Sequence, residues 1–71
     1  MDNEDASPIL RYFSYDHLPT HLQHLSANFY NFARFLDAIL PNGPEKSVAL
    51  RKLLESKDAA VRSALDIHPQ N

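Results

Sequence analysis

The chain has 71 residues, no cysteine, a single glycine and a formal net charge of −2. A chain this short forms one small domain at most, and the lack of cysteine excludes disulfide bonds and thiolate metal sites. The charge argues against non-specific binding to duplex nucleic acid. No apolar run approaches the ~20 residues that span a membrane, and no signal-peptide pattern opens the chain. The sequence therefore predicts a soluble intracellular protein.

The first expected helix is short and covers about 8–14, after a flexible, acidic N-terminus at 1–6. Ser7 and Pro8 form a helix start signal, because serine is a favoured N-cap and proline is favoured at the first helical position. A helix this short is unstable alone and must dock on the rest of the chain. Pro19 disfavours helix at the residue before it, so a connector follows.

The central expected helix is long and covers about 20–40. Its apolar residues recur at alternating spacings of three and four, which is typical of a helix that packs on other helices. They are Leu22, Leu25, Phe29, Phe32, Leu36 and Ile39. A proline-bounded turn at 41–44 then reverses the chain into a second long helix over about 44–66. This helix has its own apolar stripe: Leu50, Leu53, Leu54, Val61, Ala64 and Leu65.

The expected fold is therefore all-α, with a short N-terminal helix followed by a long antiparallel helical hairpin. It forms a single helical domain at 7–67, followed by a C-terminal tail at 68–71. A domain of this size is marginally stable by itself. Because the chain is 44% hydrophobic and has no disulfide to reinforce it, assembly into a helical homo-oligomer is expected.

Catalytic signatures are lacking in the sequence. The serines do not form a nucleophile elbow, and one glycine cannot form a glycine-rich phosphate loop. His17, His21 and His24 have metal-ligand spacing, but Pro19 interrupts the helical register between the first two. We therefore expect a non-enzyme with no metal or cofactor, and solvated histidines.

Aromatic residues cluster before the long helix, where Tyr12, Phe13 and Tyr15 lie within four positions. With Arg11 and His17 beside them, these rings could stack on a planar ligand such as a base. The alternative is that they are the apolar contact that holds the short N-terminal helix in place. Tyr15 suits a half-exposed position best, because its hydroxyl group favours contact with water.

Basic residues are concentrated on the last helix. Lys46 lies near its N-terminus, where the helix dipole favours anions. Lys57 falls inside the apolar stripe, so it either points into a pocket that a phosphate would fill or snorkels at an interface. A charged stripe, expected to pair within itself in solvent, completes the helix: Arg51, Glu55, Asp58 and Arg62.

Two short motifs carry a family resemblance. One is the Phe-Ser-Tyr step at 13–15, and the other is the run EKSVALRKLLE at 45–55. Together with the long helix between them, they resemble the small tailed-phage proteins that counter CBASS immunity by sequestering cyclic oligonucleotides. The resemblance covers about 12–65.

The resemblance implies a compact homohexamer that binds cyclic dinucleotides in pockets between protomers and cyclic trinucleotides at separate sites. Such a protein would bind the signal without cleaving it in the cytoplasm of the infected bacterial host, so that the CBASS effector is not activated. Tyr15 would stack on a base, and Lys46 and Arg51 would contact phosphates.

The sequence differs from that family at one point. The family has a lysine early in the long helix to meet a phosphate, whereas His21 and His24 occur there in this chain and Arg34 comes later. Two other functions remain open. The chain could be a protein-binding adaptor whose apolar stripe receives a partner helix, or a small structural oligomer without a ligand.

Overall fold

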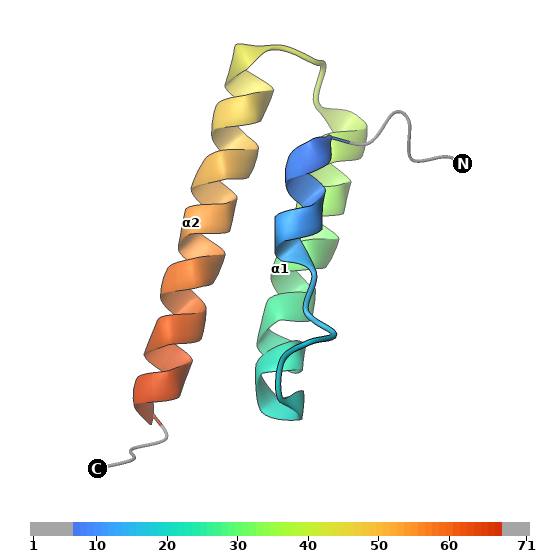
Figure 1. Cartoon of the computed structure of the whole chain (residues 1–71). Coiled ribbons are helices and arrows are strands. Elements are labelled where there is room, and N and C mark those ends of the chain that lie inside the picture. Colours follow the sequence, from blue (N-terminus) through green and yellow to red (C-terminus); the bar gives the residue numbers. More distant parts are fainter. Residues whose placement is uncertain (1–6, 68–71) are drawn as a thin grey trace.

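A computed structural model describes residues 7–67, and their side chains through residue 65. It contains a short 3₁₀-helix, η2 (Pro8–Phe13), and two long α-helices, α1 (Thr20–Ile39) and α2 (Pro44–Ile67). No strand occurs in this part of the chain, so the expected all-α class is confirmed. Figure 1 shows α1 and α2 as an antiparallel pair, with η2 packed alongside them and antiparallel to α1.

The short helix η2 begins after Ser7, as its Ser-Pro signal predicts, but the serine does not cap it with its side chain. The Ser7 hydroxyl instead donates a hydrogen bond to the carboxylate of Asp37 in α1. The backbone carbonyl of Ser7 accepts from the amide of Leu10 at 3.0 Å. Ser7 thus starts the helix and also fastens it to α1.

Both ends of α1 are set by residues just outside it. The carbonyl of Pro19 accepts from the amides of Leu22 and Gln23 at 2.9 and 3.0 Å, and the Gln23 side chain donates to the Leu18 carbonyl at 2.7 Å. At the other end the chain reverses through Gly43, whose φ of 157° is one that residues with side chains rarely adopt.

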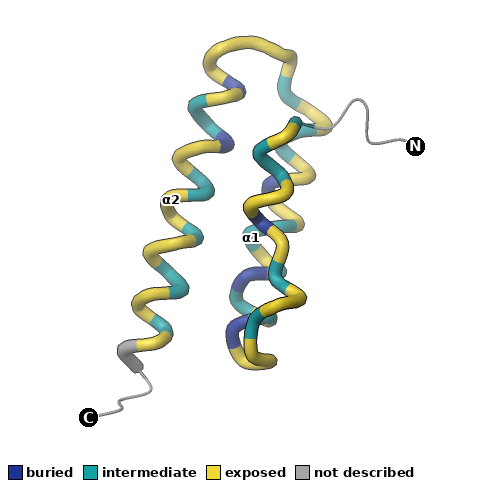
Figure 2. Tube along the Cα trace, in the orientation of Figure 1, coloured by how far each residue is buried: buried dark blue, intermediate teal, exposed yellow. Residues whose placement is uncertain are grey.

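The most buried part of the core is small and takes one residue from each helix. Phe13 of η2, Ala33 of α1 and Leu50 of α2 are at most 1% exposed and form one cluster. Figure 2 shows the buried positions on the surfaces where the three elements meet. The small Ala33 side chain leaves room for the Phe13 ring between η2 and α1.

The apolar seam expected on the central helix is only partly correct. Leu22 is buried, but Phe32 and Ile39 are 50% and 56% exposed. Ser26 and Ala33 occupy the buried face instead. Because η2 and α2 both pack on α1, its inner face approaches two neighbours closely and favours small residues. The apolar residues spaced three and four apart therefore do not all lie on one face: Leu22 lies on the buried face of α1, and Phe32 and Ile39 lie on the exposed one.

No helix within the described residues is long and apolar enough to cross a membrane.

Candidate ligand-binding site

A shallow, open pocket lies where the connector after η2 passes over α1. Its volume is about 340 Å³. Ser14, Tyr15 and Asp16 line it from the connector, and Tyr30 lines it from α1. A pocket of this size with two aromatic walls can accept one planar group, such as a nucleobase.

The two tyrosine rings form the apolar part of this pocket. Their centroids lie 5.7 Å apart with an interplanar angle of 62°, an edge-to-face arrangement. Both side chains are half-buried. Among residues 7–67 neither the Tyr15 nor the Tyr30 hydroxyl has a hydrogen-bond partner. Both hydroxyl groups can therefore bond to water or to a ligand.

A cation lies beside the pocket. The guanidinium carbon of Arg34 is 5.9 Å from the centre of the Tyr30 ring, within the range of a cation–π contact. Tyr30 and Arg34 are four residues apart on α1, so the helix itself brings them together. The guanidinium can provide positive charge for an anion next to a base held by the tyrosines.

The chain holds Tyr15 in place from both sides. Phe13, two residues earlier, is buried in the core. After Tyr15 the connector turns, and the Leu18 amide donates to the Tyr15 carbonyl at 3.0 Å. Phe13 is the last residue of η2, and Ser14 after it is extended. The change from 3₁₀-helix to extended backbone lets the Phe13 ring enter the core and the Tyr15 ring line the pocket.

Lys46 joins the two long helices near the hairpin turn. Its Nζ lies 2.7 Å from the Asp37 carbonyl, 3.2 Å from Asp37 Oδ1 and 3.1 Å from Asn42 Oδ1. The three N–H groups of the ammonium thus have three acceptors. The side chains of Lys46 and Asp37 are only 8% and 11% exposed. Lys46 is therefore a buried residue that links α2 to α1 and to the turn between them; we call this set of contacts the Lys46 clamp.

The carboxylate of Asp37 is shared by all three elements. Burial alone would raise the pKa of Asp37, but hydrogen bonds from Ser7 and Lys46, with the Lys46 charge, outweigh it. The pKa of Asp37 is therefore lowered below its ordinary value of 3.8. The carboxylate stays ionised at neutral pH and holds η2 and α2 on α1.

Two of the residues expected to contact a ligand are enclosed by the chain itself. Phe13 has no exposed surface, so its ring belongs to the core and offers no face for stacking. Lys46 has its donors occupied within the chain, so it has none left for a phosphate in this conformation. Burial is the physical reason in both cases.

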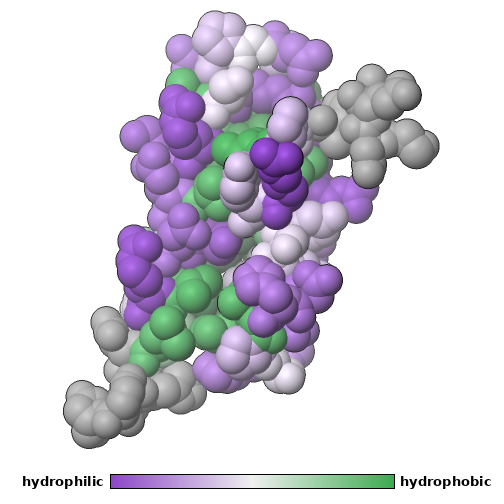
Figure 3. All heavy atoms as spheres, in the orientation of Figure 1, coloured by the Kyte–Doolittle hydropathy of each residue, from purple (hydrophilic) through white to green (hydrophobic). Residues whose placement is uncertain are grey.

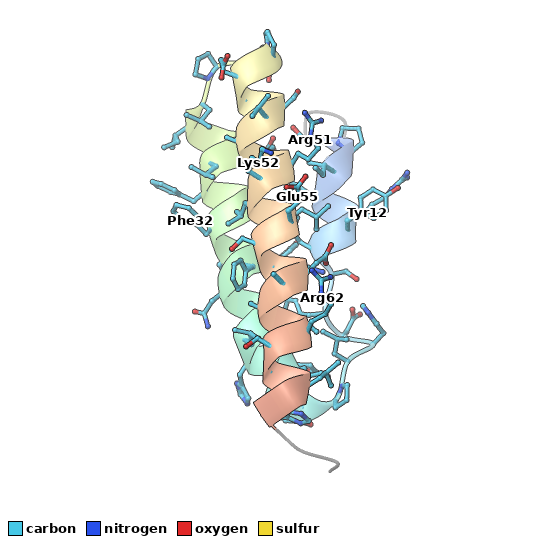
Figure 4. The ribbon with its side chains drawn as sticks, turned by 90° about the vertical axis from the view of Figure 1, so that its left-hand side faces the viewer. Tyr12, Phe32, Arg51, Lys52, Glu55 and Arg62 are labelled. Atoms are coloured by element: carbon cyan, nitrogen blue, oxygen red, sulfur yellow. The ribbon has the colours of Figure 1, made fainter. Side chains whose placement is uncertain are left out.

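The other expected ligand residues lie apart from one another. Tyr15 lines the pocket, and His17 is exposed on the connector. Arg51 is exposed on α2, as Figure 4 shows. Lys57 is mostly covered and pairs with Asp58 at 3.2 Å, and its side chain is 12% exposed. Of this set, the structure brings only Tyr15 to the pocket.

The charged stripe on α2 is exposed as expected but pairs differently. Glu55 lies 3.7 Å from Lys52, and Asp58 pairs with Lys57, so both carboxylates contact lysines rather than the arginines of the stripe. Lys52, Glu55, Arg51 and Arg62 all extend from α2 in Figure 4.

Sequence reasoning did not select three of the residues at the pocket: Asp16, Tyr30 and Arg34. One signal for Tyr30 and Arg34 was available. A tyrosine and an arginine four apart on a helix lie side by side, and both fall off the apolar seam. Asp16 carried no comparable signal, because its position depends on how the connector folds over α1.

An apolar stripe is the second prominent surface feature. Phe32, Phe35 and Ile39 of α1 are each at least half exposed. The rings of Phe32 and Phe35 stack with centroids 6.0 Å apart. In Figure 4, Phe32 points away from the molecule on the side opposite Tyr12. Figure 3 shows further apolar side chains gathered between α2 and the two elements beside it, η2 and α1.

Comparison with protein-family models, with curated proteins and with solved structures finds no match to this chain. Within the described residues, no group of three or more histidine, aspartate or glutamate side chains could hold a metal ion.

Proposed function

We propose that this protein binds cyclic di- or trinucleotides and sequesters them without cleaving them. The observation that carries the proposal is the pocket between Tyr15 and Tyr30, with Arg34 beside it. Tyr15 is the residue for which the family resemblance implies base stacking. Stacking of a base on an aromatic side chain contributes about 1–3 kcal/mol, and Arg34 supplies a cation for the phosphate next to that base.

Self-association is part of this proposal. One base pocket holds one half of a cyclic dinucleotide, so two copies of the chain are needed to hold both bases. The stripe of Phe32, Phe35 and Ile39 provides an apolar surface for such contacts. The resemblance favours a homohexamer. Arg51, exposed on α2, would then contact a phosphate held against a neighbouring copy.

The biological role follows from the same resemblance. The protein would act in the cytoplasm of a bacterial host during phage infection, where cyclic oligonucleotides signal to CBASS effectors. Bound messengers would not reach those effectors. Release of the intact messenger from denatured protein distinguishes this sponge from an enzyme that degrades the same signal.

The test is a thermal-shift screen of the purified chain against cyclic di- and trinucleotides, with linear dinucleotides as controls. A ligand that binds the folded state raises Tm with increasing concentration. Tyr15→Ala should abolish the shift. Tyr12→Ala is the matched control, because Tyr12 is 56% exposed and lies outside the pocket. If the protein is a folded oligomer and no cyclic nucleotide raises its Tm, the proposal is rejected. If Tyr15→Ala still binds, the stacking role of Tyr15 is rejected.

The second candidate function is a protein-binding adaptor. Its supporting observation is the same exposed stripe on α1, which an amphipathic partner helix would cover. Nucleotide binding and the exposure of the apolar stripe distinguish the two functions. An adaptor ignores cyclic nucleotides and leaves its apolar stripe uncovered in the purified protein, whereas the sponge buries that stripe between its own copies.

A further inference from the structure

We infer that Asp16 makes the pocket selective for guanine bases. This inference rests on the proposed function, since it concerns which base the pocket between Tyr15 and Tyr30 takes. Asp16 directly follows Tyr15 and lines the same pocket. It is the acidic group in a site otherwise formed by two tyrosines and a serine.

The carboxylate of Asp16 is not engaged elsewhere. Its side chain is exposed, and no hydrogen bond or ion pair to this carboxylate is found within residues 7–67. Asp37 and Asp58, in contrast, are each paired with a lysine. The nearby Arg34 contacts the Tyr30 ring and leaves Asp16 unneutralised. Asp16 therefore has acceptor oxygens available at the pocket.

An ionised carboxylate only accepts hydrogen bonds, with two oxygens side by side. The Watson–Crick edge of guanine presents two neighbouring donors, N1–H and the N2 amino group, so guanine can form two parallel bonds to one carboxylate. Adenine has a single donor there, beside an acceptor. Uracil has one donor between two carbonyl oxygens, which the carboxylate repels. Guanine is thus the base that best fits an acidic residue at the edge of the stack.

The same charge constrains the phosphates. A carboxylate next to a phosphate would weaken binding through repulsion, so the phosphate must lie away from Asp16. Arg34 provides a site for it, because its guanidinium lies over Tyr30 of α1 while Asp16 belongs to the connector. Asp16 and Arg34 thus approach the pocket from different elements. This separation suits a nucleotide, whose nucleobase edge and phosphate also lie apart.

The experiment compares affinities for cyclic di-GMP, cyclic di-AMP and cyclic di-UMP by isothermal titration calorimetry. The wild-type chain should bind cyclic di-GMP about 5- to 150-fold more tightly than cyclic di-UMP, since a good bidentate base contact gives about 1–3 kcal/mol of discrimination. Asp16→Asn presents a donor and an acceptor in nearly the same shape. This variant should lose the preference for cyclic di-GMP and bind cyclic di-AMP more tightly than the wild type does.

Glu55→Gln is the charge-matched control, because Glu55 is exposed on α2 and also loses one negative charge. Glu55→Gln should keep the preference for cyclic di-GMP. Any change in its affinity should be the same for all three cyclic dinucleotides. Equal affinities in the wild type, or an unchanged preference in Asp16→Asn, would overturn the inference and leave the proposed function standing. If no cyclic nucleotide binds, the proposed function fails and the inference fails with it.

Discussion

Ser26 occupies a fully buried position on α1, and its hydroxyl has no hydrogen-bond partner within the described residues. A buried hydroxyl without a partner loses its bonds to water on folding and gains none in return. Its small size explains why it is there, because α1 is closely approached at this face. The residue thus contributes through its volume, whereas its polarity opposes folding.

We predict that Ser26→Ala stabilises the protein. Alanine keeps the small volume and removes the unsatisfied group, so the free energy of unfolding should rise by about 1 kcal/mol. For a domain this small, that raises Tm by roughly 4–8 °C. Ser56→Ala, at an exposed position of α2, controls for helix propensity. A lower Tm in Ser26→Ala than in this control would show that the hydroxyl has a stabilising partner.

The tripeptide Phe13-Ser14-Tyr15 shows how far residue types alone lead. Its aromatic character indicated both docking and stacking, and both are physically sound uses of a ring. The structure buries Phe13 and leaves Tyr15 half-exposed beside Tyr30. That division depends on where η2 ends and the extended connector begins, and local composition does not specify it.

At the scale of elements, the carboxylate of Asp37 is the point where η2, α1 and α2 are fastened together. Ser7 donates to it from the start of η2, and Lys46 pairs with it from the first turn of α2. A lysine with three fixed acceptors is well satisfied despite its burial. Removal of one partner leaves the opposite charge buried without compensation.

Lys46→Met should therefore destabilise the fold by about 3 kcal/mol or more, because Asp37 would remain ionised and buried. Equilibrium urea unfolding followed by circular dichroism measures the change. Lys52→Met is the matched control, since Lys52 is 69% exposed and pairs loosely with Glu55. That variant should stay within about 0.5 kcal/mol of the wild type. Equal stabilities of the two variants would contradict a structural role for the Lys46 clamp.

The lowered pKa of Asp37 also predicts an acid dependence. The unfolded carboxyl group has the ordinary pKa of 3.8, and the pKa of the folded one is lower. The stabilisation from this group is thus fully present above the unfolded value and is lost as the pH falls through the folded one. We expect the free energy of unfolding to fall as the pH drops below about 4, with a smaller fall in Asp37→Asn. Parallel pH curves for the two proteins would refute this.

The elements themselves were largely predictable, for local reasons. Each of the three helices begins at or just after a proline: Pro8, Pro19 and Pro44. Proline restricts the backbone angle φ wherever it occurs. The 3₁₀ form of η2 and the inner face of α1 were not predictable in this way. Both depend on packing between segments: η2 is shaped by its contact with α1, and α1 places Ser26 and Ala33 inside because two neighbours share that face.

The whole molecule is thin for its length, with extents of 44 × 25 × 15 Å. The Cα atoms of one helix span about 5 Å, and packed helices lie about 8–10 Å apart, so the smallest dimension holds about two helices. With so few elements, η2 and α2 cover the inner side of α1, and its outer side is left exposed among the described residues. The exposed stripe of Phe32, Phe35 and Ile39 is a direct result of this shape.

Phe35→Glu should prevent self-association, because a charge in the middle of the stripe cannot be buried between copies without a large cost. Sedimentation velocity at several concentrations would report the mass. Tyr12→Glu introduces the same charge at a residue that is 56% exposed on another surface, and it should leave the mass unchanged. A wild-type chain that is already monomeric would contradict an interface on α1.

The candidate site was harder to predict than the fold, because it is formed by residues distant in the sequence. Tyr15 was recognisable from its composition and its motif. Its pocket also needs Tyr30, fifteen positions later, and only the folded connector brings them together. Lys46 had a position suited to anion binding, but its burial beside Asp37 became apparent only with the packing of the two helices.

The two bonding partners of Asp37 differ in how far they lie along the chain, and this difference has a kinetic consequence. Lys46 is 9 residues away from Asp37 and Ser7 is 30 residues away. Loops that close over short separations form at a lower entropic cost, so the hairpin of α1 and α2 should form before η2 docks. The pocket, which needs the docked connector, is then the last part to form and the first to open. Amide hydrogen exchange should accordingly be faster at residues 14–18 than at Ala33 or Leu50, and a ligand held between Tyr15 and Tyr30 should slow it.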